Sequence, residues 1–179
     1  MATDGSRGRR LVVDLNAKSR SWALTEQGER RIRDAAPAGW DVQVVRAMTS
    51  SDGDGPESPD PEVMAAIADA EVYFGFGIPK PLFLAAKRLK WVHSAAAGVG
   101  SALYPEMLKS DVLFTNSAGV HANPIAEYVV GVVLHFTRGF DIAIEQQRRV
   151  EWNKEPFVGP SSPLREMDSV HATDRKSVV

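Results

Sequence analysis

Residues 89–103 read L-K-W-V-H-S-A-A-A-G-V-G-S-A-L, and this stretch runs from an expected strand through a turn into the start of a helix. The apolar residues at its start are typical of a buried strand, which we expect over Trp91–His93. Alanines and Gly98-Val99-Gly100 then form a turn, and a short helix is expected over Ala102–Lys109. A buried strand that leads directly into a helix is the repeating unit of α/β proteins with a parallel sheet.

The same alternation of strand and helix patterns runs through the sequence on both sides of this stretch. Further strands are expected over Leu11–Leu15, Val42–Val45, Glu71–Phe74 and Val112–Thr115, and further helices over Glu26–Ala35, Pro61–Ala68 and Leu82–Lys87. The strand residues are apolar in succession, as expected when helices cover both faces of a sheet. We therefore predict an α/β fold of the flavodoxin-like, doubly wound type, with a parallel five-stranded sheet of order 2-1-3-4-5.

A long C-terminal helix completes the predicted fold. Asn123 is a candidate N-cap with Pro124 at the first helical position, and the apolar residues that follow repeat at helical spacing. Two interpretations are open, because the helix either breaks at Gly139 or continues over 124–150. A continuous helix would be about 40 Å long, which exceeds what a small domain can cover. We favour this continuous helix and expect it to reach towards another domain or subunit.

The composition excludes several classes of protein and of site. The formal net charge is -2 and there is no cysteine, which argues against nucleic-acid or anionic-membrane partners and excludes disulfides and thiolate metal sites. The opening residues lack the apolar stretch of a secretory signal, and no run approaches the roughly 20 apolar residues of a membrane helix. The histidines are scattered, so no metal site is predicted. We expect a cytoplasmic protein with no nucleic-acid or membrane partner.

The small residues between Ala95 and Gly100 are the best candidate binding site. Small side chains let a ligand approach the backbone, and amides at the start of a helix favour a carboxylate or a phosphate. The alternative is that a tight strand-to-helix turn simply requires glycine. Gly75-Phe76-Gly77 also follows a strand, but Ile78-Pro79 stands where a dinucleotide fingerprint needs its helix entry and third glycine.

His121 is the histidine with the strongest case for a function. It follows the last expected strand, and doubly wound sheets bind ligands at the carboxyl ends of their strands. A solvent-exposed or structural histidine in a loop is the alternative, because the sequence offers no acidic partner that would tune it.

Three stretches resemble the D-isomer-specific 2-hydroxyacid dehydrogenases: residues 89–103, residues 111–140 (DVLFTNSAGVHANPIAEYVVGVVLHFTRGF) and residues 146–157 (QQRRVEWNKEPF). The landmarks that match the family are, in order, Trp91, Ala97-Gly98-Val99, Thr115-Asn116, Ala126-Glu127, Arg138-Gly139 and Trp152. Gly100 departs from the family, which usually has aspartate there.

The resemblance implies a two-domain enzyme that transfers hydride between NAD or NADP and a D-2-hydroxy acid or 2-keto acid, and that is a homodimer at full length. It also implies that the amides of Gly98 and Val99 hold the substrate carboxylate. Phe76 and His121 would line the cleft, and Ala97 would lie near the nicotinamide of the cofactor.

The resemblance also implies that the catalytic residues are missing. In the family, the catalytic arginine, glutamate and histidine and the cofactor fingerprint lie in or just after the nucleotide-binding domain. Here the fingerprint strand is due after residue 166, where the sequence instead reads MDSVHATDRKSVV. We therefore expect no catalytic residue in this chain, which would be an inactive fragment of the enzyme.

The expected organisation has four parts: a disordered N-terminus (1–10), the flavodoxin-like substrate domain (11–121), an inter-domain helix (122–152), and a truncated linker with a foreign tail (153–179). Two alternatives stay open. One is a stand-alone flavodoxin-like binding or regulatory module without catalysis. The other, which the sequence favours less, is an interaction protein that dimerises through the long helix.

Overall fold

The computed structural model of the chain describes residues 8–50 and 58–158. The chain divides into two compact units, with the boundary between Val120 and His121. The expected foreign tail lies outside the described residues. Among the residues described, no helix has both the length and the apolar character needed to cross a membrane.

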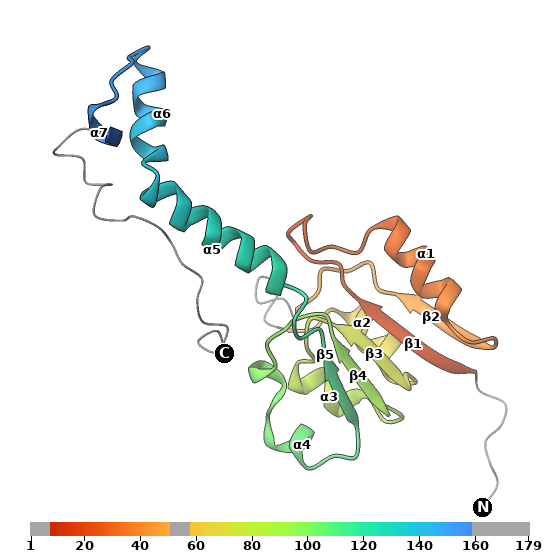
Figure 1. Cartoon of the computed structure of the whole chain (residues 1–179). Helices are drawn as coiled ribbons and strands as arrows, with labels where there is room; N and C mark the ends of the chain where they lie inside the picture. Colours follow the sequence, from red (N-terminus) through yellow and green to blue (C-terminus); the bar gives the residue numbers. More distant parts are fainter. Residues whose placement is uncertain (1–7, 51–57, 159–179) are drawn as a thin grey trace, which may run out of the picture. The chain divides into compact units, whose positions relative to one another are not determined.

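The first unit contains a five-stranded, all-parallel sheet of order β2-β1-β3-β4-β5 (Figure 1). The strands are β1 (Arg9–Asp14), β2 (Trp40–Val44), β3 (Val72–Gly75), β4 (Trp91–Ser94) and β5 (Leu113–Asn116). The predicted fold class and strand order are confirmed. Disorder was expected over residues 1–10, and this prediction is wrong for Arg9 and Arg10, which belong to β1. Arg10 pairs with Asp41 of β2.

Short helices connect the strands of this unit. They are α1 (Glu26–Ala35), α2 (Pro61–Ile67), α3 (Lys80–Ala85), a 3-10 turn (Gly100–Ala102) and α4 (Pro105–Leu108). The single helix expected over Ala102–Lys109 is therefore two separate pieces. The cause is Pro105, which disfavours helical backbone at the residue before it, and Tyr104 is extended with φ -84° and ψ 159°.

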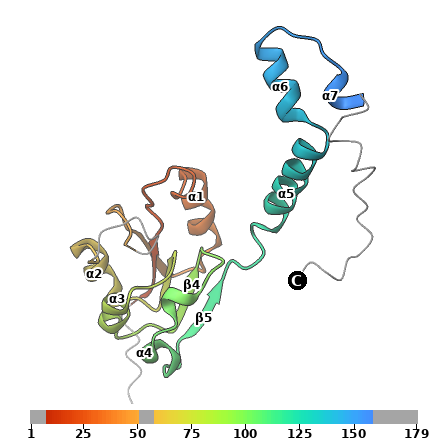
Figure 2. The same cartoon turned by 90° about the vertical axis from the view of Figure 1, so that its left-hand side faces the viewer.

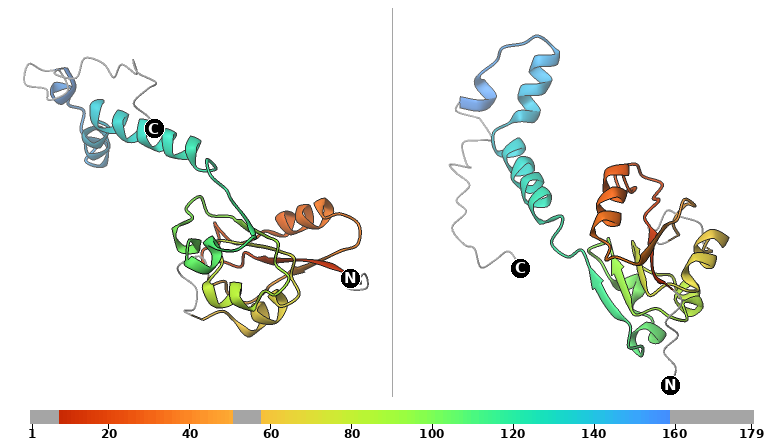
Figure 3. Two further views of the ribbon diagram at one scale, coloured as in Figure 1. Left: turned by 90° about the horizontal axis from the view of Figure 1, so that it is seen from below. Right: turned by 90° about the vertical axis from the view of Figure 1, so that its right-hand side faces the viewer.

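Helices cover the two faces of the sheet unequally. One face carries α2, α3 and α4, whose apolar side chains form a core cluster with Val12, Tyr73 and Val92. The other face carries α1 alone, on the opposite side of the sheet from α2 and α3 (Figures 2 and 3). Among the described residues of this unit, no helix covers the second face over β4 and β5, and Trp91 and Leu113 are 40% and 58% exposed.

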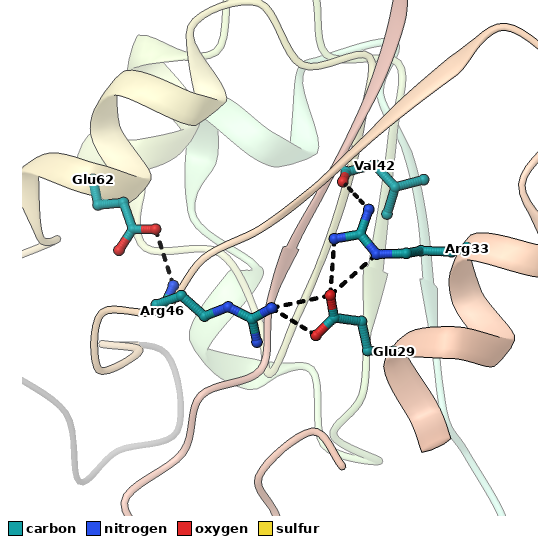
Figure 4. Close-up of polar contacts among 5 residues, drawn as sticks. All are labelled: Glu29, Arg33, Val42, Arg46 and Glu62. Carbon is teal, nitrogen blue, oxygen red and sulfur yellow. Dashed lines mark hydrogen bonds and ion pairs between the residues drawn. The ribbon is translucent and has the colours of Figure 1, made fainter. Parts of the chain in front are cut away.

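A polar network fixes α1 and α2 against the end of β2 (Figure 4). Glu29 accepts hydrogen bonds from Arg33 in its own helix and from Arg46 just after β2. Arg33 also donates to the carbonyl of Val42 at 2.7 Å, and the backbone amide of Arg46 donates to Glu62 of α2 at 3.0 Å. The hydrogen bond from Arg33 is the main cause that lowers the pKa of Glu29.

The second unit is helical, and its first helix is interrupted. Its helices are α5 (Ala122–Thr137), α6 (Phe140–Arg148) and α7 (Glu155–Val158). The continuous helix expected over 124–150 is wrong, because Gly139 adopts a left-handed conformation (φ 62°, ψ 36°) between α5 and α6. Glycine takes this conformation at little cost and commonly ends helices in this way.

The start of α5 also differs from the expectation. His121, not Asn123, is the N-cap residue, and no side-chain hydrogen bond caps the helix. Ala122 is the first helical residue, so Pro124 occupies the third position. Proline is tolerated there because the amides of the first turn have no partner within the helix.

Candidate functional site

The loop that follows β4, residues 95–99, exposes backbone donors at the carboxyl edge of the sheet. The amide of Ala95 donates to the carbonyl of Gly75 at 2.6 Å, and the amide of Ala96 donates to Oγ of Ser94 at 3.2 Å. In the part of the chain that the structure describes, the next three amides, those of residues 97–99, donate no hydrogen bond. Successive backbone amides without a partner form a concavity that favours an anion.

The glycines of this loop are not required by its backbone. Neither Gly98 nor Gly100 has a positive φ, and a Cβ added to either would meet no atom within 4 Å. The alternative interpretation, that a tight turn needs glycine here, is therefore not supported. What the glycines provide instead is an uncovered backbone.

The last residue of β5 and the residue that follows it hold the first part of the 95–99 loop. The amide of Ser117 donates to the carbonyls of Ser94 and Ala96 at 3.0 and 3.3 Å. The side-chain amide of Asn116, Nδ2, donates to the carbonyl of Ala97 at 2.7 Å. Sequence reasoning used Asn116 only as a landmark; the register of β4 on β5, which pairs Ser94 with Asn116, is what brings this side chain to the loop.

A chain of hydrogen bonds occupies the open face of β4 and β5. Nε1 of Trp91 donates to Oγ1 of Thr115 at 2.8 Å, and the same oxygen lies 2.8 Å from Nδ1 of His93. Nε2 of His93 lies 3.4 Å from Oγ of Ser117. Because an indole can only donate, the hydroxyl oxygen of Thr115 accepts from Trp91, and the same oxygen is hydrogen-bonded to Nδ1 of His93. This arrangement gives His93 a structural role beneath the loop.

The loop after β3 lies beside the loop after β4. Gly77 has a φ of 145°, and a Cβ there would lie 3.5 Å from Oγ of Ser101 in the 3-10 turn. Phe76 is 8% exposed, and its ring packs in the cluster that contains Val13 and Leu15. The side chain of Phe76 is therefore mainly a core group, and the loop offers a ligand little more than its backbone.

His121 belongs to the second unit, as the N-cap residue of α5. The turn before it contains Gly119, whose φ is 84°, and the amide of Val120 donates to the carbonyl of Ser117 at 3.3 Å. Of the predicted site residues, the first unit thus brings together Ala97, Gly98, Val99 and the backbone of the loop that contains Phe76.

The loops after β3 and β4 have groups that can bind a ligand but none that can transfer a proton. Residues 75–79 and 95–99 contain no titratable side chain, so these segments can hold an anion but cannot move a proton. Among the residues described, no group of three or more metal-ligating side chains is clustered. The six-residue helix α3 follows Pro79 and has no side-chain cap, which differs from the glycine-led helix that binds a pyrophosphate.

No protein-family model and no curated protein sequence matches the chain. Solved structures do match it. A D-isomer specific 2-hydroxyacid dehydrogenase family protein from Aeromonas salmonicida is 22% identical with a TM-score of 0.60, over 85% of this chain and 43% of its own. A phosphoglycerate oxidoreductase from Rhizobium etli is 16% identical with a TM-score of 0.53, over 87% and 45%.

An acyclic imino acid reductase, solved in complex with NADPH and D-Arg, is 14% identical with a TM-score of 0.57, over 83% of this chain and 44% of its own. At sequence identities this low, the similarity shows a shared fold. The chain spans less than half the length of each of these proteins. It shares its fold with part of an enzyme of the D-isomer specific 2-hydroxyacid dehydrogenase family.

Proposed function

We propose that this chain is the substrate-binding part of an NAD(P)-dependent oxidoreductase that acts on a D-2-hydroxy acid or the matching 2-keto acid. The observation that carries the proposal is the run of three unpartnered amides, residues 97–99, at the carboxyl end of β4. The amides of Gly98 and Val99 hold the substrate carboxylate. Ala97 borders the nicotinamide, and the loop of Phe76 borders the substrate.

The surroundings of these amides suit a carboxylate. Alanines precede Gly98 and their short side chains leave the amides accessible, and hydrogen bonds to a charged acceptor are stronger than those to a neutral one. The structural likeness adds support, because the acyclic imino acid reductase was solved with D-Arg, an amino acid whose carboxylate is bonded directly to the carbon that bears the amino group. In a 2-keto acid the carboxylate is bonded in the same way to the keto carbon.

The cofactor, NAD or NADP, requires residues beyond those described. It supplies or accepts the hydride when bound, but neither described loop offers the glycine-led helix that holds its pyrophosphate. With no titratable side chain in either loop, proton transfer to the substrate also needs a group from elsewhere. We expect the chain alone to be inactive, and assays with NADH and pyruvate should give no turnover above a blank.

The binding site can be tested directly by NMR on the ¹⁵N-labelled chain. Pyruvate should shift the backbone amides of residues 97–99, whereas pyruvamide, which has the same shape without the charge, should leave them in place. Gly98→Val should weaken the pyruvate response because a branched side chain crowds the amides, while Gly131→Val on the exposed face of α5 should not. Shifts located elsewhere, or equal shifts with pyruvamide, would exclude this carboxylate site.

A stand-alone binding module is the second candidate, favoured by the lack of titratable side chains in both loops. The two functions differ in ligand preference. A substrate site for 2-keto acids should respond to pyruvate at lower concentration than to inorganic phosphate. A general anion-binding module should respond at least as well to phosphate, which offers more acceptor oxygens.

We also propose that the complete enzyme is a homodimer and that the second unit contributes to its interface. Several apolar side chains of α5 are more than half exposed: Ile125, Tyr128, Val129, Val130 and Phe136. Exposed apolar patches of this kind promote association. In sedimentation experiments the chain should self-associate with rising concentration, Val129→Lys should weaken this, and Leu108→Lys on α4 should not. A monomer at all concentrations would count against the proposal.

A further inference from the structure

We propose that Asn116 is a positioning residue, which orients the backbone amides that bind the carboxylate without contacting the ligand itself. The inference rests on the proposed function of the 95–99 loop. Its basis is the hydrogen bond of 2.7 Å from Nδ2 of Asn116 to the carbonyl oxygen of Ala97, the first residue of the unpartnered run. Asn116 is the last residue of β5, so its backbone is fixed by the sheet.

The geometry of the peptide bond transmits this contact to Gly98. The described chain has no cis peptide bond, and in a trans peptide the carbonyl and the following N–H point in opposite directions. When Asn116 holds the Ala97 carbonyl towards β5, the N–H of Gly98 is directed away from β5. One side-chain hydrogen bond thus fixes the direction of the amide that binds the ligand.

Among the residues that the structure describes, no other hydrogen bond holds the Ala97–Gly98 peptide in this way. The backbone amide of Ser117 donates to the carbonyls of Ser94 and Ala96, and its hydroxyl also donates to the carbonyl of Ser94. They persist whatever side chain stands at 116. Loss of the Asn116 side chain should therefore release the loop from Ala97 onwards and leave its first two residues in place.

Glycine makes this constraint necessary. A Cβ at Gly98 would meet no atom within 4 Å, so no packing contact restricts the peptide around it. Glycine also has the widest range of backbone conformations. Without an external hydrogen bond, the Ala97–Gly98 peptide can rotate, and the fraction of molecules with both amides turned outward falls. Affinity for a ligand falls in proportion to that fraction.

The test compares Asn116→Ala and the equally sized Asn116→Asp with the unaltered chain, and uses Asn123→Ala in α5 as the control for loss of an asparagine. Two quantities are measured: the heteronuclear NOE of each loop amide in the ligand-free chain, and the affinity for pyruvate. In both variants at position 116, the NOE of Gly98 and Val99 should fall and pyruvate should bind roughly tenfold more weakly. Ala95, Ala96 and the control should not change.

The outcomes separate the inference from the function on which it rests. If the unaltered chain binds no pyruvate at residues 97–99, the proposed function fails and the role of Asn116 fails with it. If the unaltered chain binds and Asn116→Ala changes neither quantity, the inference alone is overturned. A weaker affinity with an unchanged NOE also overturns it, because Asn116 would then contact the ligand directly.

Discussion

The hydroxyl of Tyr73 donates a hydrogen bond of 2.6 Å to Oδ2 of Asp14 inside the first unit. Tyr73 and Asp14 are 0% and 1% exposed, and they lie on the neighbouring strands β3 and β1. Asp14 is the last residue of β1, so its carboxylate lies at the carboxyl edge of the sheet. A buried carboxylate requires hydrogen-bond donors, and Tyr73 supplies one of them from the adjacent strand.

Tyr73→Phe should lower the free energy of unfolding of the first unit by about 1–3 kcal/mol, because the buried carboxylate of Asp14 loses a donor while the packing of the ring is kept. Chemical denaturation followed by tryptophan fluorescence measures the effect. Tyr128→Phe is the matched control, since Tyr128 is 73% exposed. Equal stability of the two variants would show that the hydrogen bond contributes little.

Two glycines, Gly75 at the end of β3 and Gly98 in the loop after β4, should respond differently to the same substitution. A Cβ on Gly75 would lie 2.6 Å from the hydroxyl oxygen of Tyr73, whereas a Cβ on Gly98 would meet nothing within 4 Å. Gly75→Ala should therefore destabilise the first unit by about 1–3 kcal/mol through overpacking. Gly98→Ala should stay within about 0.5 kcal/mol of the unaltered chain. Thermal or chemical unfolding compares them, and a large loss for Gly98→Ala would contradict the open loop described above.

Glu71 is a charged group near the opposite, amino edge of the sheet. Its side chain is 5% exposed and accepts hydrogen bonds from Arg9, Arg88 and Lys90 at 3.2, 3.1 and 3.0 Å. The hydrogen bond from Lys90 is the main cause that lowers the pKa of Glu71, and burial opposes it. The carboxylate is thus stabilised in its ionised form when the chain is folded.

The stabilising contribution of Glu71 should depend on pH in a defined direction. Because its pKa is lowered on folding, the contribution is present above the ordinary glutamate pKa of about 4.3 and is lost as the pH falls through the lower folded value. Glu71→Gln should cost about 1–3 kcal/mol near pH 7, and the difference from the unaltered chain should shrink below about pH 4. Unfolding curves over this range, with exposed Glu151→Gln as control, test both the size and the sign.

The fold was predictable because each strand has a recognisable local pattern in the sequence. Runs such as Leu11–Leu15 are apolar on successive residues, and right-handed crossovers then leave few possible strand orders. The 95–99 loop could be located for the same reason, since small residues directly follow a strand. The contact from Asn116 to Ala97 could not be predicted, because it depends on how β5 is aligned with β4, and register is a property of the folded sheet.

The helix break was not resolved by the sequence, because a glycine within an apolar helical pattern is compatible with both outcomes. Gly131 and Gly139 illustrate the point. Gly131 continues through the interior of α5, whereas Gly139 has a φ of 62° and separates α5 from α6. Local spacing does not distinguish them; the conformation of the backbone does.

Alanine substitution at these two glycines should change stability in opposite directions. At Gly131 alanine should stabilise the second unit by up to about 1 kcal/mol, because glycine is the poorer helix former and its surroundings are open. At Gly139 alanine should destabilise it by about 1–2 kcal/mol, because an L side chain clashes with the backbone in the left-handed conformation. Unfolding followed by circular dichroism at 222 nm measures both variants, and the helical signal of folded Gly139→Ala shows whether α5 and α6 have fused. If Gly139→Ala were as stable as Gly131→Ala, the left-handed break would not be a constraint on this sequence, and a continuous helix would be equally accessible to it.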